Sequence, residues 1–409
     1  MKDGGIEMQK MDGANCGRLL RDIEDLASIG GDERTGTNRM AYSKAFLEGR
    51  DFVKKRMEEA GLETRVDRVG NLYGLLQPTD CTAGFSKRIA VGSHIDTVPH
   101  GGKYDGALGV LGGIEAVRRL RAAGYGNRHP IEIIAFNEEE GNVIGGTFGS
   151  KAFAGAALEE AMLVPMEDHG ITEEDFRSCR VSPDDYFCYM EYHIEQGGIL
   201  ERDQKEIGIV EGIFGIVRYR AVVTGKANHA GSTPMDLRDD ALEKSCRIIE
   251  DLMKRTRRSG NTMVATVGTI RLDPGAVNVI PGKAEFIIEL RDKTVAAVFR
   301  LIEELRERWQ EEGLSLEEYL IQPETVCDPG LETAIEESAK ALGFSTERMY
   351  SGAGHDVINT SFVTPSGMLF IPSIGGISHH RDEYSCPQDI ERGVAVLTET
   401  IMRIDGGNR

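Results

Sequence analysis

The sequence lacks the features of a secreted or membrane-spanning protein. Its seven cysteines are scattered along 409 residues, and no two of them form a CxxC pair. An odd number of cysteines without a framework of spacings is typical of a reduced, intracellular protein. The N-terminal residues MKDGGIEMQKMDGANCG contain no apolar stretch like that of a signal peptide. No apolar run approaches the roughly 18 residues of a membrane-spanning helix, so we expect a cytoplasmic protein.

Several common catalytic and binding signatures are missing too. There is no GxSxG nucleophile elbow, and no cysteine has the flanking residues of a known catalytic thiol. The stretch GGTFGSK at 145–151 lacks the Gly-Lys-Ser/Thr ending of a phosphate-binding loop. Lys and Arg number 48 against 67 Asp and Glu, which gives a net charge of −19. Because such an acidic surface repels phosphate backbones and anionic lipid headgroups, we expect no nucleic-acid and no membrane partner.

The length and the order of the predicted elements indicate two domains. A chain of 409 residues is too long for one ordinary core. Helical periodicity at 17–29, 40–60 and 106–124 alternates with strand-like patterns, of which RIAVGS (88–93) and IEIIAF (131–136) are typical of buried strands. This alternation predicts an α/β domain with a mixed, largely parallel sheet and helices on both faces.

The pattern changes near Ile213. From there the sequence predicts a strand, a helix, two strands, a helix and a last strand, LSLEEYLIQ. This β-α-β-β-α-β order is typical of a ferredoxin-like α+β domain. The later segments, which end in a strand MLFIPS and a final helix, fit the first α/β layer again. We therefore predict a catalytic domain of residues 1–212 and 327–409, into which a domain of residues 213–326 is inserted.

Metal-type ligands follow two of the predicted buried strands. His94 comes directly after RIAVGS, with Asp96 two residues later and Asp105 just before the next helix, and the run Glu138–Glu140 follows IEIIAF. The carboxyl ends of strands in an open α/β sheet converge on one crevice. Three adjacent carboxylates alone would be a charged, solvated loop, but buried beside His94 and Asp105 they are costly without a cation. The combination therefore favours a metal site.

Two further histidines fit the same chemistry, although each alone is more often structural than a ligand. His193 lies in EYHIEQG and His379 in GISHHRDEYS. Three histidines with aspartate and glutamate could furnish two divalent sites that share a bridging carboxylate. Imidazole and carboxylate ligands suit zinc, manganese or cobalt, and the order of affinities alone does not choose among these metals.

These residues lie in blocks that resemble a known family of enzymes, the dinuclear-metal amidohydrolases. That family comprises the N-carbamoyl-L-amino-acid hydrolases, allantoate amidohydrolases and β-ureidopropionases, and it belongs to the wider aminoacylase–carboxypeptidase group. The blocks follow the family's order along nearly the whole chain, and HIEQG and NHAGSTPM point to the carbamoylase branch rather than to ordinary peptidases. The matching blocks are GSHIDTVPHGGKYDGALGVLGGIEA, FNEEEG, YHIEQG, TGKANHAGSTPMDLRDDA, DPGAVNVIPG, ELRD, GAGHD and GISHHRDEYS.

The resemblance implies two divalent metal ions per subunit and assigns their ligands. One ion is expected on His94, Asp105 and His193. The other is expected on Asp105, Glu140 and His379, so that Asp105 bridges the two ions. All five positions carry a residue of the required type in this sequence.

The resemblance also assigns residues around the metals. Asp96 is expected to orient, through its carboxylate, the ring of the histidine two residues before it, and Glu139 is expected to act as the general base. His380 is expected to be a solvent-facing neighbour of the ligand histidine. His229 is expected to polarise the scissile carbonyl from the other subunit of a homodimer, which makes 213–326 a dimerisation or lid domain.

Substrate recognition is expected in both domains. Arg291, Asn278 and Arg218 resemble a clamp for a substrate carboxylate, because a guanidinium fork binds a carboxylate through two hydrogen bonds. Either arginine alone would be about as well explained as an exposed strand residue. Gln196 is expected at the ureido end of the substrate. His355 is expected near the substrate and, with the aspartate that follows it, behind the metal ligands.

One loop departs from the family. There an Arg-Phe pair commonly follows EEG after one residue, whereas this chain reads Asn142, Val143 and Ile144. Because this loop borders the expected metal site, it is where we expect the substrate pocket to differ from that of the best-known members.

The expected activity is metal-dependent hydrolysis of a linear amide or ureido C–N bond, with an N-carbamoyl-L-amino acid converted to the L-amino acid, CO2 and NH3. Allantoate amidohydrolase and β-ureidopropionase are the alternatives within the family, and a dipeptidase or N-acyl amino-acid deacylase is a more distant one. A non-catalytic binding protein or a metal-stabilised structural protein would be expected to lack a ligand or the base. Every one of those positions is filled.

Overall fold

The computed structural model divides into two compact units. Unit 1 comprises Met1–Glu211, Val326–Met349 and Gly354–Arg409, and unit 2 comprises Gly212–Thr325 and Tyr350–Ala353. The structure describes residues 14–32, 34–79, 86–260 and 262–407. Residues 1–13, which make up most of the N-terminal stretch without a signal-peptide pattern, lie outside the described residues. None of the described helices is long and apolar enough to cross a membrane.

Unit 1 is built on a mixed sheet whose centre is parallel. Strands β17 (Ser366–Ile371), β7 (Tyr186–Ile194), β5 (Arg88–His94) and β6 (Ile131–Phe136) lie side by side in that order, each parallel to its neighbours. Nearly every residue of these strands is buried, so both faces of the sheet are covered. The predicted mixed, largely parallel sheet is confirmed. Its flanking strands are β3 (Glu63–Val66), β4 (Leu72–Leu76), β8 (Ile207–Ile213), β15 (Thr325–Val326) and β16 (Thr346–Ser351).

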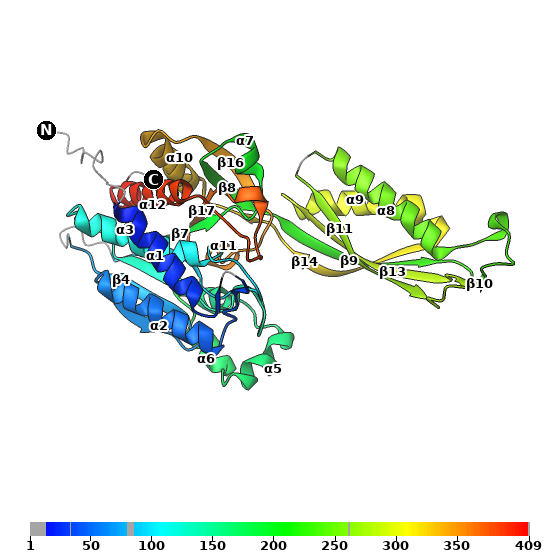
Figure 1. The fold of residues 1–409 in the computed structure, drawn as a ribbon, viewed down its shortest axis with the longest axis horizontal. Helices are drawn as coiled ribbons and strands as arrows, with labels where there is room; N and C mark the ends of the chain where they lie inside the picture. Colours follow the sequence, from blue (N-terminus) through cyan, green and yellow to red (C-terminus); the bar gives the residue numbers. More distant parts are fainter. Residues whose placement is uncertain (1–13, 33, 80–85, 261, 408–409) are drawn as a thin grey trace. The chain divides into compact units, whose positions relative to one another are not determined.

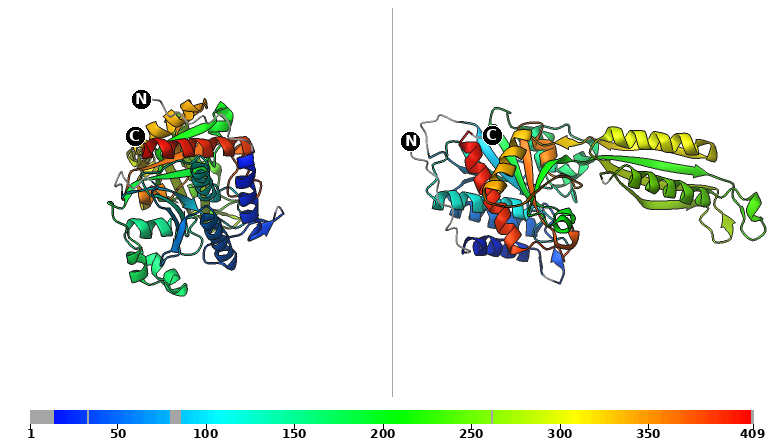
Figure 2. Two further views of the ribbon diagram at one scale, coloured as in Figure 1. Left: turned by 90° about the vertical axis from the view of Figure 1, so that its left-hand side faces the viewer. Right: turned by 90° about the horizontal axis from the view of Figure 1, so that it is seen from above.

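Helices pack against this sheet. The helix α12 (Pro387–Asp405), red in Figure 2, packs against α3 (Ala107–Ala122) and α10 (Pro329–Ala341). The start of α10 is fixed by Asp328, whose carboxylate accepts a hydrogen bond from the N–H of Leu331. The remaining helices of unit 1 are α1 (Ala14–Ser28), α2 (Lys44–Glu59), α4 (Phe148–Ala154), α5 (Glu160–Asp168), α6 (Glu173–Ser178), α7 (Ile199–Asp203), α11 (Val357–Thr360) and the 3-10 turn η4 (Ile374–Gly376). A small hairpin joins β1 (Gly31–Asp32) and β2 (Gly36–Thr37).

The segment between β6 and β7 contains three short helices that the sequence did not predict. These helices, α4 to α6, close over a small separate core that includes Ile144, Phe148 and Met162. The helix α6 begins with a capping box, in which Thr172 and Asp175 bond each other's backbone N–H groups. Ile144, which departs from the family pattern, is therefore a core residue.

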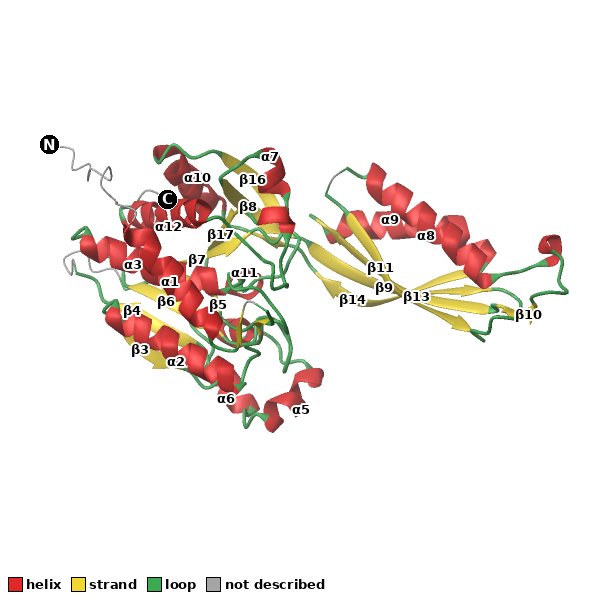
Figure 3. Ribbon diagram, in the orientation of Figure 1, coloured by secondary structure: helices red, strands yellow, loops and turns green. Residues whose placement is uncertain are grey.

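Unit 2 has the predicted ferredoxin-like fold, which is thereby confirmed. Its four antiparallel strands lie in the order β11-β13-β9-β14, and α8 and α9 lie together on one face of that sheet (Figures 1 and 3). Alternate strand residues face these helices and form a core of their own, because a strand turns every second side chain to the same face. The bounds are β9 (Gly215–Thr224), α8 (Ala241–Arg258), β11 (Val264–Asp273), β13 (Lys283–Asp292), α9 (Val295–Trp309), η3 (Gln310–Glu312) and β14 (Leu314–Gln322).

A two-stranded sheet at one end of unit 2 brings two expected substrate residues together. It pairs β10 (Asn228–His229) with β12 (Val279–Ile280), and η2 (Met235–Leu237) follows in the β10 loop. The N–H of Ala230 donates to the backbone oxygen of Asn278 at 3.0 Å. The side chains of His229 and Asn278 are therefore carried by neighbouring chain segments.

Candidate metal centre

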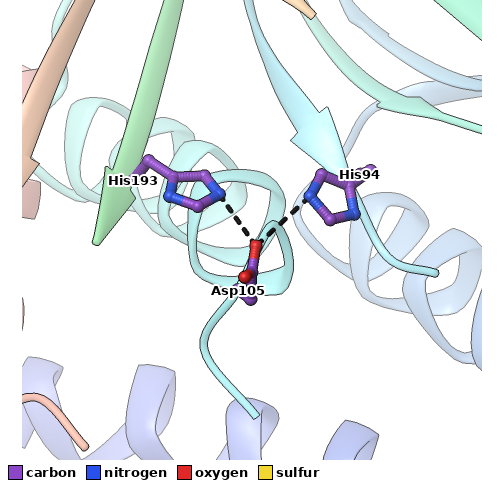
Figure 4. A group of neighbouring side chains, drawn as sticks. All are labelled: His94, Asp105 and His193. Carbon is purple, nitrogen blue, oxygen red and sulfur yellow. Dashed lines mark ion pairs between the residues drawn. The ribbon is translucent and has the colours of Figure 1, made fainter. Parts of the chain in front are cut away.

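Two neighbouring parallel strands bring two histidines to one edge of the unit 1 sheet. His94 is the last residue of β5, and His193 is the next-to-last residue of β7, which pairs with β5. Asp105 lies in the loop that leads from β5 to α3. Figure 4 shows its carboxylate between the two rings: Oδ1 lies 3.5 Å from Nε2 of His94 and 3.2 Å from Nε2 of His193. These three buried side chains are close enough to hold one metal ion.

Backbone contacts orient both rings with Nε2 toward the aspartate. Nδ1 of His94 lies 3.0 Å from the backbone oxygen of Asp96, and Nδ1 of His193 lies 2.8 Å from that of Ile194. Because a carbonyl oxygen only accepts, each Nδ1 carries the ring hydrogen and each Nε2 of the neutral ring presents a lone pair. Nε2 of His94 and the Asp105 oxygen then face each other as acceptors, and Nε2 of His193 accepts the backbone N–H of Gly106 at 3.0 Å as well as facing Asp105. A cation shared among them relieves this arrangement, so the residues fit a metal.

The other oxygen of Asp105 belongs to a second group. Nε2 of His379 lies 3.3 Å from Oδ2 of Asp105 and 3.4 Å from Oε2 of Glu140. These three residues again are close enough to hold an ion. His379 lies in a loop with a left-handed backbone (φ 54°), and its side chain is half-exposed. Imidazole and carboxylate donors of this kind suit divalent metals.

A third group of ligand-type side chains shares a residue with the first. Glu191, His193 and His355 are buried and close together. Since Nδ1 of His193 contacts a backbone carbonyl and its Nε2 faces Asp105, this group and the first are alternatives. His355 is 1% exposed and packs edge-on against the ring of His193, with 4.7 Å between ring centroids. It is thus a buried neighbour of His193, as expected for a residue behind the candidate ligands, and its contact with the substrate stays a prediction.

The carboxylates of the site have strongly shifted pKa values. Burial raises the pKa of Glu139 well above its usual range, and the like charge of Glu140 adds to the effect. Burial also raises the pKa of Glu140 to about 7. Burial alone would raise the pKa of Asp105 too, but its contacts with the three histidines hold it well below the usual value. Oε2 of Glu139 lies 3.7 Å from Nε2 of His94, so a carboxylate able to take up a proton borders the first group.

Asp96 contacts the His94 ring and also the backbone of the two glutamates. Its carboxylate lies 3.6 Å from Nδ1 of His94, farther away than its own backbone oxygen at 3.0 Å. The carboxylate also accepts the backbone N–H groups of Glu139 at 3.3 Å and Glu140 at 3.1 Å. Asp96 therefore orients the His94 ring through its carbonyl and fixes the backbone of both glutamates through its side chain.

Glu138, the first glutamate of the run, anchors the loop that follows the site. Its Oε1 accepts the backbone N–H groups of Val143, Ile144 and Gly145 at 2.6, 2.7 and 3.3 Å. The side chain of Asn142 reaches the backbone oxygen of Thr97 at 3.4 Å. Beyond the run of glutamates itself, no sequence pattern indicated this role, because the partners of Glu138 are backbone groups.

Gln196 and His380 lie at the periphery of the two groups. Gln196 has a left-handed backbone (φ 57°), and its Nε2 donates to Oδ2 of Asp105 at 2.8 Å. Its buried Oε1 has no hydrogen-bond partner among the described residues. The side chain of His380 is 54% exposed and lies 3.5 Å from Asp382.

The two arginines of the expected clamp lie together in unit 2. Nε of Arg218 lies 2.7 Å from Oε2 of Glu289, and Nη2 of Arg291 lies 2.7 Å from Oε1 of the same residue. Arg218 and Glu289 are direct partners in the pairing of β9 with β13. Glu289 lies between two guanidinium groups that would otherwise repel each other. No motif in the sequence indicated this residue.

Comparison with known proteins identifies the family. The profile described as peptidase family M20/M25/M40 matches residues 90–403. The chain belongs to this family. M20 members are metal-dependent, in agreement with the groups of histidine, aspartate and glutamate around Asp105.

Relatives within the M20 family carry three activities in their names. The N-carbamoyl-L-amino acid amidohydrolase of Geobacillus stearothermophilus is 34% identical over 95% of this chain and 98% of that protein. The allantoate amidohydrolase of Bacillus subtilis is 34% identical over 98% of this chain and 100% of that protein. The ureidoglycolate hydrolase of Oryza sativa is 32% identical over 94% and 84% of the two chains. Among solved structures, a hydantoinase/carbamoylase-family amidase from Burkholderia multivorans superposes with a TM-score of 0.85 at 31% identity, covering 94% of this chain and 97% of that one.

The family assignment confirms the resemblance drawn from the sequence blocks. This M20 chain is an enzyme, a hydrolase of C–N bonds other than peptide bonds. The alternatives of a non-catalytic binding protein and of a metal-stabilised structural protein are thereby wrong.

Proposed function

We propose that this M20 hydrolase cleaves a ureido C–N bond beside a carboxylate, and that its substrate is an N-carbamoyl-L-amino acid, which it converts to the L-amino acid, CO2 and NH3. The observation that carries the proposal is the position of Asp105, whose two oxygens face two separate groups of ligand-type side chains. The names of the carbamoyl and allantoate relatives support the ureido class of substrate.

The proposed cofactor is a pair of divalent cations, zinc or else manganese or cobalt. One would be held by His94, Asp105 and His193, and the other by Asp105, Glu140 and His379. Bound there, such cations supply Lewis-acid chemistry, which acidifies water and polarises a carbonyl group. Nε2 of His94 and Nε2 of His193 lie 3.5 and 3.2 Å from the same oxygen of Asp105, which supports this assignment.

Glu139 is the proposed general base. Its carboxylate is buried beside His94, and burial raises its pKa, which makes it a stronger base than a solvated carboxylate. Glu139 takes a proton from water. The oxygen of that water bonds to the ureido carbon, the bond from this carbon to the amino-acid nitrogen breaks, and the departing nitrogen takes the proton from Glu139. The carbamic acid that is released decomposes to CO2 and NH3. Asp96 supports this role by holding the N–H of Glu139 in place.

The proposed clamp for the substrate carboxylate consists of Arg218, Asn278 and Arg291. Asn278 lies beside His229 and before the start of β13, whereas Arg291 is the next-to-last residue of that ten-residue strand, so one chain does not bring Asn278 to the two arginines. We propose that Asn278, like His229, reaches the clamp from the partner subunit.

Arg291 donates Nε–H and one Nη2–H to Glu289 and one Nη1–H to the backbone oxygen of Gly352. A guanidinium group has five N–H groups, so these contacts leave one on each terminal nitrogen. Two such donors match the two oxygens of a carboxylate.

Two other side chains are proposed to bind the ureido group itself. The unpartnered Oε1 of Gln196 is a buried acceptor, which an N–H of the substrate would satisfy. Nδ1 of His229 accepts the backbone N–H groups of Gly231 and Ser232 at 3.0 and 3.1 Å. The hydrogen of the neutral ring is therefore on Nε2, where it can donate to the substrate carbonyl and stabilise the oxyanion that forms.

We further propose a homodimer in which His229 serves the site of the partner subunit, with unit 2 as the dimerisation and lid domain. The loop that carries His229 also carries Met235 and Leu237, each 71% exposed, and Val277 lies fully exposed just before β12. An exposed apolar group of this kind is typical of a surface that another protein covers. A second copy of the chain is the proposed occupant.

Allantoate is the second candidate substrate, because the allantoate amidohydrolase relative is as similar to this chain as the carbamoylase. Ureidopropionate and ureidoglycolate complete the ureido acids to compare. The deciding experiment measures kcat/KM for all four with the metal-loaded protein, beside an N-acyl amino acid and a dipeptide. The carbamoyl amino acid is expected to be fastest. A clear preference for allantoate would replace the carbamoylase assignment, and faster turnover of the acyl or peptide substrate would restore the deacylase alternative.

A further inference from the structure

Glu383 accepts hydrogen bonds from both of the loops that carry Asp105 and His379. Its Oε1 accepts the backbone N–H of Tyr104 at 2.9 Å and that of Asp105 itself at 3.1 Å. Its Oε2 accepts the hydroxyl of Ser378 at 2.9 Å. The side chain is 3% exposed. One buried carboxylate thus contacts the shared aspartate on one side and the residue before His379 on the other.

The surroundings of Glu383 leave little freedom for either loop. A Cβ atom on Gly102 would overlap the carboxyl group of Glu383, so the Asp105 loop packs directly onto this side chain. The Ser378 hydroxyl also lies 3.0 Å from Oδ2 of Asp105, the oxygen that faces His379. The contacts of Glu383 therefore converge on the Asp105–His379 side of the site.

The two groups of ligands differ in how they are held. His94 and His193 are strand residues of the central sheet, whose backbone positions are fixed by pairing with neighbouring strands. His379 lies in an irregular loop and is half-exposed. The position of this loop relative to Asp105 depends on contacts such as those of Glu383.

We propose that Glu383 is a positioning residue for the second group, and that its loss weakens the ion on Asp105, Glu140 and His379 while sparing the ion on His94, Asp105 and His193. This inference rests on the proposed two-metal site. Hydrogen-bonding partners outside the ligand set commonly change metal affinity by about 10–100-fold when they are removed. The same range is expected here for one ion.

The test measures the two dissociation constants for zinc by equilibrium dialysis of the full-length protein after chelator treatment. Glu383→Ala is expected to raise one of them ~10–100-fold and to leave the other within a few-fold. Glu383→Gln is expected to restore most of the loss, because one amide oxygen can still accept both backbone N–H groups. Asp382→Asn, an exposed neighbour on the same loop, is the matched control and is expected to bind both ions like the wild type.

Equal weakening of both ions, no weakening, or the same loss in Asp382→Asn would overturn the inference. Ser378→Ala keeps the backbone contacts of Glu383 and provides a second variant should Glu383→Ala not fold. It is expected to weaken the binding of the same single ion by a smaller factor. Unchanged binding of both ions, or equally weakened binding of both, would contradict the proposal. If the wild type itself binds no zinc, the proposed function fails instead, so the two failures are distinguishable.

Discussion

Nε2 of His379 lies 3.3 Å from Oδ2 of Asp105, the carboxylate oxygen opposite the one that faces His94 and His193. One aspartate therefore lies between two groups of candidate ligands that come from distant parts of the chain. The proposed chemistry depends on each oxygen of Asp105 facing its own group, because one carboxylate could then hold two cations beside the buried Glu139.

The neighbouring residues Glu139 and Glu140 are expected to respond differently to the same substitution. Glu139→Gln should retain both metal ions and lose about 10²–10⁴-fold in kcat, since glutamine is nearly isosteric but cannot take up a proton. Glu140→Gln should lose one ion, because Oε2 of Glu140 lies 3.4 Å from His379 in the second group. Metal content by emission spectrometry and kcat measured on the same preparations separate the two roles. Unchanged kcat in Glu139→Gln, or loss of metal there, would mean that the two assignments are reversed or wrong.

The proposed homodimer predicts complementation between two inactive chains. A His229→Ala chain lacks the donor that serves the partner's site, and a Glu139→Gln chain lacks the base in its own. In a mixed dimer, one of the two sites combines an intact Glu139 with an intact His229, so each mixed dimer is expected to have about half of wild-type activity. Random exchange of equal amounts makes about half of the dimers mixed, so the mixture is expected to regain about a quarter. The measurement is activity after mixing, with subunit exchange followed by mass labels. Mixed dimers that stay inactive despite exchange would argue against a site shared between subunits.

The carboxylate clamp predicts a specific interaction between Arg291 and the substrate. Replacing the substrate carboxylate by a carboxamide should lower kcat/KM by the equivalent of about 2–5 kcal/mol, because a charge of the clamp is left unpaired. Arg291→Met should cause a similar loss on the carboxylate substrate and little further loss on the carboxamide. Arg220→Met is the matched control, since Arg220 lies on the same sheet and pairs with Glu285 and Glu317 instead. Equal losses on both substrates would show that Arg291 supports the fold and not the carboxylate.

The sequence predicted the elements whose pattern is local and strong. Strands β5 and β6 are buried on both faces and therefore appear in the sequence as apolar runs. The strands of unit 2 are buried on one face, so apolar and polar residues alternate along them. Strand β7, which carries His193, was not predicted. Its sequence YFCYMEYHI is almost wholly buried yet includes the polar residue Glu191, so neither an apolar run nor an alternation marks it.

The candidate ligands could be found from the sequence, but the residues that hold them in place could not. Glu138 and Glu383 bind backbone N–H groups, and any residue other than proline supplies such a group, so no pattern of side chains reveals the contact. Asp96 was expected to orient His94 through its carboxylate, whereas its carbonyl makes the shorter contact. No sequence pattern showed that His355 packs edge-on against the ring of His193.

The central claim is that Asp105 organises a metal-dependent ureido hydrolase. Its most direct test follows the release of ammonia and free amino acid from an N-carbamoyl-L-amino acid by the full-length protein, before and after chelation and again after zinc, manganese or cobalt is added. We predict that chelation abolishes turnover and that one of these metals restores it, whereas an Asp105→Asn chain stays inactive with any of them. Full turnover by the metal-free protein, or restored turnover in Asp105→Asn, would contradict the account.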